Sequence, residues 1–124
     1  MCGIDYLKNY LTDNGFKWRE EGEIFQFSYH ELTCVVPIDT TDAVRIFVMF
    51  GTEEDDISLL SEVCNDINKL LFLVKCFIHN EKLFFTLYFE PNEHMQDKDY
   101  KAYLASLTEA VAHFNEQLKK RTNQ

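Results

Sequence analysis

Four consecutive carboxylates and a scattering of thiols and imidazoles are the groups of this 124-residue chain that could do chemistry. The carboxylates run from Glu53 to Asp56 and stand directly before a segment with apolar residues at helical spacing. Carboxylate oxygens can bind hard metal ions, but acids at the start of a helix also meet the positive end of its dipole. The acidic helix start is the favoured interpretation, and no metal site is predicted.

The histidines and cysteines are spread along the chain. They are His30, His79, His94, His113, Cys2, Cys34, Cys64 and Cys76. No HExxH or CxxC pattern joins them, so they indicate neither a zinc site nor a cofactor. A nucleophilic cysteine needs a neighbouring base or a helix N-terminus, whereas Cys34, Cys64 and Cys76 fall inside apolar patterns and are expected in the core. Only the Cys2 thiol is expected to be exposed, and all four are expected to be reduced.

Sequence motifs that build catalytic sites do not occur. The serines stand in no G-x-S-x-G turn, and the four glycines are too dispersed to form a phosphate-binding or dinucleotide-binding loop. The chain is therefore predicted not to be an enzyme. A small enzyme with a pocket assembled across a sheet is the alternative, and a deep pocket lined by titratable side chains with shifted pKa values would favour it.

The stretch from Asn65 to Asn68 is the most distinctive short sequence. Its two asparagines are three residues apart in a predicted helix and so share one face. Asparagine is a poor helix former, and an apolar stripe does not require it. The pair is therefore a possible polar recognition site. The alternative, which physical reasoning alone favours, is that the side chains face solvent or hydrogen-bond a neighbouring loop.

Charge and composition limit the classes of partner. The apolar fraction of 46% is that of a globular protein, and the net charge of −9 opposes binding to nucleic acid and to anionic membranes. A basic or neutral protein partner is expected instead. No apolar stretch is long enough to cross a membrane, and the N-terminus does not read as a secretory signal, so a cytoplasmic location is predicted.

Apolar periodicity predicts one α+β domain over residues 1–124. Helices are expected at 4–14, 57–70 and 98–120, and strands at 23–30, 31–38, 43–50, 72–79 and 82–90. This α-β-β-β-α-β-β-α order predicts a five-stranded antiparallel sheet with helices mainly on one face. A parallel crossover from strand 43–50 through helix 57–70 to strand 72–79 is the competing topology.

Two of the predicted strands are apolar on both faces, which is unusual for a half-buried antiparallel sheet. Three helices can cover only one face, so the other would expose Phe47, Met49, Phe84 and Tyr88 together. An exposed apolar patch of this kind marks an interface. The four residues are predicted to form a surface for a partner segment or for a homodimer, unless one helix crosses to bury them.

The phrase Cys64-Asn65-Asp66-Ile67-Asn68 and the following Val74-Lys75-Cys76-Phe77-Ile78 resemble the YbjN-like, or bacterial sensory transduction regulator, family. In that family an asparagine-bearing helix precedes a strand carrying a lysine. The resemblance implies the fold of the type III secretion chaperones, a commonly dimeric protein, and no established catalytic residues. It extends to nearly the whole chain in element order, and to residues 60–90 in motif.

The leading functional prediction is a non-catalytic protein-binding module, chaperone-like or regulatory, which holds a partner segment or its own copy against an apolar sheet face. No cofactor, metal, nucleic acid or membrane is predicted to bind. A structural subunit of a larger complex is a third possibility, after the small enzyme.

Overall fold

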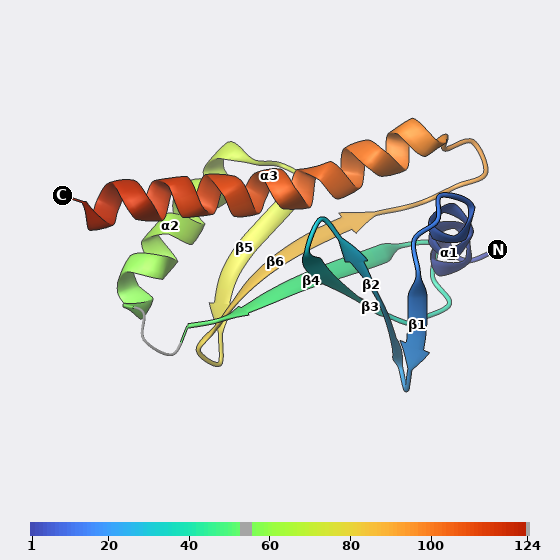
Figure 1. The fold of residues 1–124 in the computed structure, drawn as a ribbon, viewed down its shortest axis with the longest axis horizontal. Coiled ribbons are helices and arrows are strands. Elements are labelled where there is room, and N and C mark those ends of the chain that lie inside the picture. The colour runs from blue at the N-terminus through green and yellow to red at the C-terminus, as the bar shows by residue number, and fades with distance from the viewer. Residues whose placement is uncertain (53–55, 124) are drawn as a thin grey trace.

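The computed structural model describes residues 1–52 and 56–123 as one antiparallel sheet and three helices (Figure 1). The helices are α1 (Gly3–Asp13), α2 (Ile57–Leu70) and α3 (Asp97–Thr122). The strands are β1 (Trp18–Glu21), β2 (Ile24–Tyr29), β3 (Leu32–Pro37), β4 (Val44–Gly51), β5 (Val74–His79) and β6 (Lys82–Phe89). The predicted helices and the five predicted strands are all present, with ends that differ by at most two residues.

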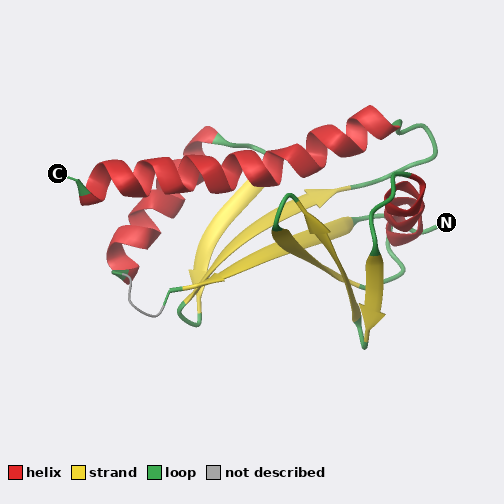
Figure 2. Ribbon diagram, in the orientation of Figure 1, coloured by secondary structure: helices red, strands yellow, loops and turns green. Residues whose placement is uncertain are grey.

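The sheet has six strands in the order β1-β2-β3-β4-β6-β5, and every neighbouring pair is antiparallel (Figure 2). The prediction of five strands was wrong, because β1 was missed. Three of its four residues are charged and exposed, so no apolar alternation marks it. The parallel crossover is excluded, since β6 lies between β4 and β5 and pairs with both.

Two tight turns fix the strand registers. His30–Glu31 joins β2 to β3 and Asn80–Glu81 joins β5 to β6, and all four residues have positive φ values between 45° and 68°. Two central residues with positive φ are typical of the turns that match the twist of antiparallel strands. The second turn, which the sequence predicts, places Phe77 opposite Phe84.

All three helices pack against the same face of the sheet. In Figure 1, α3 runs along the molecule beside β5 and β6, α2 lies beside its C-terminal half, and α1 lies at the other end. The inward residues of the strands alternate with outward ones and form a single core with the helices. Phe25, Ile46 and Phe85 from the sheet, and Leu7, Ile67 and Leu104 from the helices, are fully buried there.

Capping carboxylates and a glycine turn mark where the helices begin and end. The Asp56 carboxylate accepts a hydrogen bond from the backbone N–H of Leu59 and so caps α2. The Asp99 carboxylate accepts from the N–H of Gln96, the residue that precedes α3. Gly15, with φ of 79°, follows α1 as predicted. The other acids of the 53–56 run lie outside the described residues.

Candidate protein-binding face

The face of β4, β6 and β5 that points away from the helices is the candidate site, and we call it the open face. Strand alternation and pairing register put one set of side chains there. They are Arg45, Phe47, Met49 and Gly51 from β4, Lys82, Phe84, Thr86 and Tyr88 from β6, and Lys75, Phe77 and His79 from β5. The four residues predicted from the sequence therefore lie on one surface.

Large apolar side chains remain accessible on this face. Tyr88 is 50% exposed and Met49 52%, whereas Phe47 and Phe84 are half-buried by their neighbours. Cross-strand pairing brings Met49 directly opposite Phe84. Inward residues of the same strands, such as Ile46 and Leu87, are fully buried. No helix of the described residues crosses to this face, which was the competing expectation.

Phe77 belongs to the same surface, and the sequence reasoning missed it. Its ring stacks on Phe84 with 5.2 Å between centroids and 12° between planes, and the side chain is 39% exposed. The signal was present: a two-residue turn at Asn80–Glu81 forces residue 77 opposite residue 84. We call Phe47, Met49, Phe77, Phe84 and Tyr88 the aromatic patch.

The end of the open face where β4 begins and β6 ends carries charge of both signs. The Arg45 guanidinium lies 5.7 Å from the centre of the Tyr88 ring, within cation–π range. The Tyr88 hydroxyl donates a hydrogen bond to Glu90 at 3.1 Å, and this bond to a carboxylate raises the pKa of Tyr88. A depression of about 550 Å³ at this end also includes Asp39, whose pKa is lowered by the hydroxyl and N–H bonds that Thr41 donates. Both pKa shifts come from exposed local hydrogen bonds, so neither indicates a desolvated catalytic group.

The two asparagines of α2 differ in their surroundings. The Asn68 amide donates to the carbonyl of Cys76 at 2.8 Å and accepts from the N–H of Cys76 at 2.7 Å. These backbone groups are on β5, which lies at the edge of the sheet of described strands, beside β6. Asn68 therefore saturates part of the free edge of the sheet, whereas Asn65 is exposed to solvent. The recognition role stays a prediction, and Asn65 is the side chain that is available for it.

The thiols and imidazoles show no catalytic arrangement. Cys34, Cys64 and Cys76 are buried, and burial raises the pKa of the Cys34 thiol to about 12. The Sγ atoms of Cys64 and Cys76 are 2.8 Å apart between α2 and β5, and the hydrogen bond between these two thiols lowers the pKa of Cys64. Across residues 1–52 and 56–123, no three His, Cys, Asp or Glu side chains gather in a group that could hold a metal ion.

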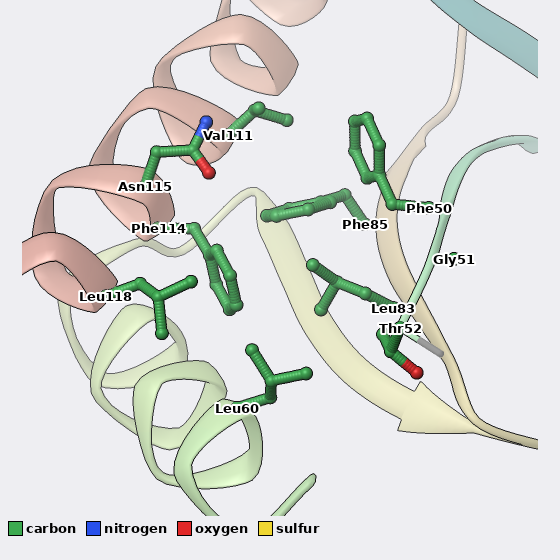
Figure 3. A pocket seen from close by; sticks show the side chains of 10 residues that line it. All are labelled: Phe50, Gly51, Thr52, Leu60, Leu83, Phe85, Val111, Phe114, Asn115 and Leu118. Carbon is green, nitrogen blue, oxygen red and sulfur yellow. The ribbon is translucent and has the colours of Figure 1, made fainter. Parts of the chain in front are cut away.

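A cavity of about 180 Å³ lies between α2, α3 and the inner face of the sheet (Figure 3). The side chains of Leu60, Phe85 and Phe114 converge on it, and Thr52 and Asn115 are the polar residues of its wall. None of the described residues that line it titrates. Among the described residues, this pocket therefore presents no acid or base of the kind that would favour an enzyme.

A second apolar surface lies outside the open face. Leu70 ends α2, and Phe72 and Leu73 lie in the connection from α2 to β5. The three side chains are 62%, 90% and 48% exposed, respectively. The sequence reasoning assigned Phe72 and Leu73 to the start of a strand. The structure begins β5 at Val74 and leaves both side chains in the connection.

The fold is that of the YbjN-like proteins. The structure matches the crystal structure of YbjN from E. coli, which has been described as a proposed transcription regulator, with a TM-score of 0.68. The match covers 98% of this chain and 93% of the YbjN chain at 16% sequence identity. No family model and no curated protein matches the sequence. Within the described residues, each helix is too short or too polar to cross a membrane.

Proposed function

We propose that this chain is a non-catalytic protein-binding module, chaperone-like or regulatory, whose open face holds a segment of a partner protein or a second copy of itself. One observation carries the proposal: the aromatic patch is accessible on a sheet face that the three helices leave bare. The regulatory description of YbjN, a protein of the same fold, agrees with a binding role.

The aromatic patch has the composition of an interface core. Aromatic and Met side chains are enriched at interfaces, and charged residues are depleted there. Burying a Phe side chain against a partner contributes roughly 1.5–3 kcal/mol. Methionine adapts its shape to different surfaces. A partner that covers Met49, Phe77 and Phe84 would therefore gain several contacts without any rearrangement of the sheet.

A double substitution tests the role of the patch. Phe47→Ser with Phe84→Ser should leave the fold intact, increase solubility, and weaken self-association or partner capture, as measured by sedimentation and by affinity capture with mass spectrometry. The more exposed pair Met49→Ser with Tyr88→Ser should act in the same direction. It guards against a folding defect, since Phe47 and Phe84 are half-buried.

A matched control removes apolar surface elsewhere. Leu70→Ser with Phe72→Ser changes two exposed side chains off the open face. If both patch variants fold and associate like the wild type, or if only the control variant loses association, the open face is not the binding surface. If both patch variants unfold, these residues are core and the proposed surface does not exist.

A further inference from the structure

From the charges on the open face we infer what kind of segment it holds: an extended, acidic segment with an apolar side chain between two carboxylates. The inference rests on the proposed function. In the strands that the structure describes, the open face carries Arg45, Lys75 and Lys82 but no Asp or Glu. The carboxylates of Glu90 and Asp39 lie beside it at the Arg45 end, away from the two lysines. Because the whole chain has a net charge of −9, the remainder of the molecule carries −12.

This distribution reverses the partner charge expected from the net charge alone. Exposed charges interact mainly within a Debye length of about 8 Å at physiological ionic strength. A bound segment therefore responds to the cations beside it more strongly than to the distant acids. Two copies stacked by their open faces would instead bring the Lys75 and Lys82 side chains of both copies to the same interface without opposing carboxylates around the Phe77–Phe84 pair, so charge favours a foreign segment over a second copy at this face.

The pairing register gives the spacing of the cations. The stacked pair Phe77 and Phe84 has Lys75 two residues away on one side and Lys82 two residues away on the other. At roughly 3.3 Å per residue, the two lysines are about 13 Å apart along the strand direction. In an extended segment, residues i, i+2 and i+4 share one face and span the same length. A segment of the form acidic-x-aromatic-x-acidic therefore matches lysine, aromatic pair and lysine in turn.

The segment must lie across the open face, because the neighbouring edge of the sheet is partly occupied. A partner strand added beside β5 would need the free N–H and C=O groups of that strand. At Cys76 both groups already bond to the Asn68 amide, at 2.7 and 2.8 Å. Contacts to side chains, rather than a new backbone ladder, therefore supply the binding.

A set of short peptides tests this inference on the intact chain. Each has blocked ends, a Gly-Ser flank and one of four cores. The cores are Glu-Thr-Phe-Thr-Glu (the Glu-Phe peptide), Gln-Thr-Phe-Thr-Gln (the Gln peptide), Lys-Thr-Phe-Thr-Lys (the Lys peptide) and Glu-Thr-Ser-Thr-Glu (the Glu-Ser peptide). Binding is followed by amide chemical shifts of the labelled protein, which locate the contact as well as its strength. The Glu-Phe peptide should shift the amides of β5 and β6 and bind about tenfold tighter than the Gln peptide, since each rim ion pair adds a modest increment.

Variants and salt separate charge from apolar contact. Lys75→Gln with Lys82→Gln should remove about that tenfold advantage and leave binding of the Gln peptide unchanged. The control Lys98→Gln with Lys101→Gln changes two exposed lysines of α3 and should have no effect. Raising the salt from low to several hundred millimolar should weaken binding of the Glu-Phe peptide and leave binding of the Gln peptide unchanged.

The outcomes distinguish the inference from the proposed function. If the Gln or Lys peptide binds the open face as tightly as the Glu-Phe peptide, the charge inference fails while the proposed function stands. If an oligothymidine strand binds the same amides at least as tightly, the face takes single-stranded nucleic acid instead, and both fail. If none of the peptides binds, the inference is overturned, and the patch variants described above still decide the proposed function.

Discussion

Replacing Asn68 by Asp tests the amide that covers the edge of β5. The change keeps the shape of the side chain but replaces its N–H donor by a second acceptor. One oxygen can still accept from the N–H of Cys76, while the other would face the carbonyl of Cys76, which the amide now bonds at 2.8 Å. The variant therefore loses one hydrogen bond and places two acceptors in contact.

The expected cost follows from the two bonds and their partial burial. A hydrogen bond contributes a net 0.5–1.5 kcal/mol, roughly, and an acceptor left unsatisfied costs about 1–3 kcal/mol. We expect Asn68→Asp to lower the free energy of unfolding by about 2 kcal/mol at pH 8. With a urea m-value of about 2 kcal/mol per molar, the midpoint of unfolding would fall by about 1 M.

A control and a pH series identify the cause. Asn65→Asp adds the same charge to the exposed part of α2 and should change stability by less than about 0.5 kcal/mol. The carbonyl of Cys76 should hold the pKa of the introduced carboxyl above its unfolded value. Protonation restores a donor, so the penalty of Asn68→Asp should be smallest at low pH and grow as the pH rises through that folded-state pKa.

Urea unfolding of the wild type and both variants at pH 4 and pH 8, followed by circular dichroism, distinguishes these causes. Equal losses for Asn65→Asp and Asn68→Asp would mean that the Asn68 amide contributes nothing beyond charge. A penalty for Asn68→Asp that does not shrink at the lower pH would refute the donor argument.

Two further predictions concern the packing of Gly3 and the thiols. Gly3→Ala should lower the melting temperature, because the added Cβ would lie 2.3 Å from the backbone oxygen of Asp42, whereas Gly51→Ala, with no heavy atom within 4 Å, should do little. The overpacking in Gly3→Ala should cost about 1–3 kcal/mol of stability, which differential scanning fluorimetry would detect as a lower melting temperature. A melting temperature equal to that of the wild type would show that the loop containing Asp42 moves aside without cost. In the native protein about one thiol should react rapidly with an aromatic disulfide reagent, since only Cys2 is accessible. Loss of that fast phase in Cys2→Ser identifies it, and three or four fast thiols would contradict the buried core.

Periodicity predicted most of the fold because most elements bury a regular stripe. The alternating Val44, Ile46 and Val48 identified β4, and the apolar spacing of Leu60, Val63 and Ile67 identified α2. β1 could not be found in this way, since Arg19, Glu20 and Glu21 present charge on both faces and only the pairing with β2 makes them a strand. Pairing of that kind is a tertiary property that local sequence does not record.

The candidate site was predicted only in part, because strand alternation is a local pattern whereas strand register is not. Alternation along β4 and β6 was sufficient to put Phe47 and Phe84 on one face. Placing Phe77 beside them required the register of the β5–β6 hairpin, and the position of Lys75 and Lys82 around the aromatic pair depends on that register too. The bonds from Asn68 to Cys76 join two elements across a connection, which no local pattern encodes.

The position of β6 between β4 and β5 separates strand pairs that should form early in folding from one that should form late. The pairs β1–β2, β2–β3, β3–β4 and β5–β6 each join neighbours in sequence, so they close short loops. Among the described strands, only the pairing of β4 with β6 joins residues far apart in sequence, from Gly51 with Lys82 to Val44 with Phe89. Closing long loops before their contacts form slows folding. The meander and the hairpin should therefore form first and dock through β6, which makes the pairing of β4 with β6 the slow step in assembling the sheet.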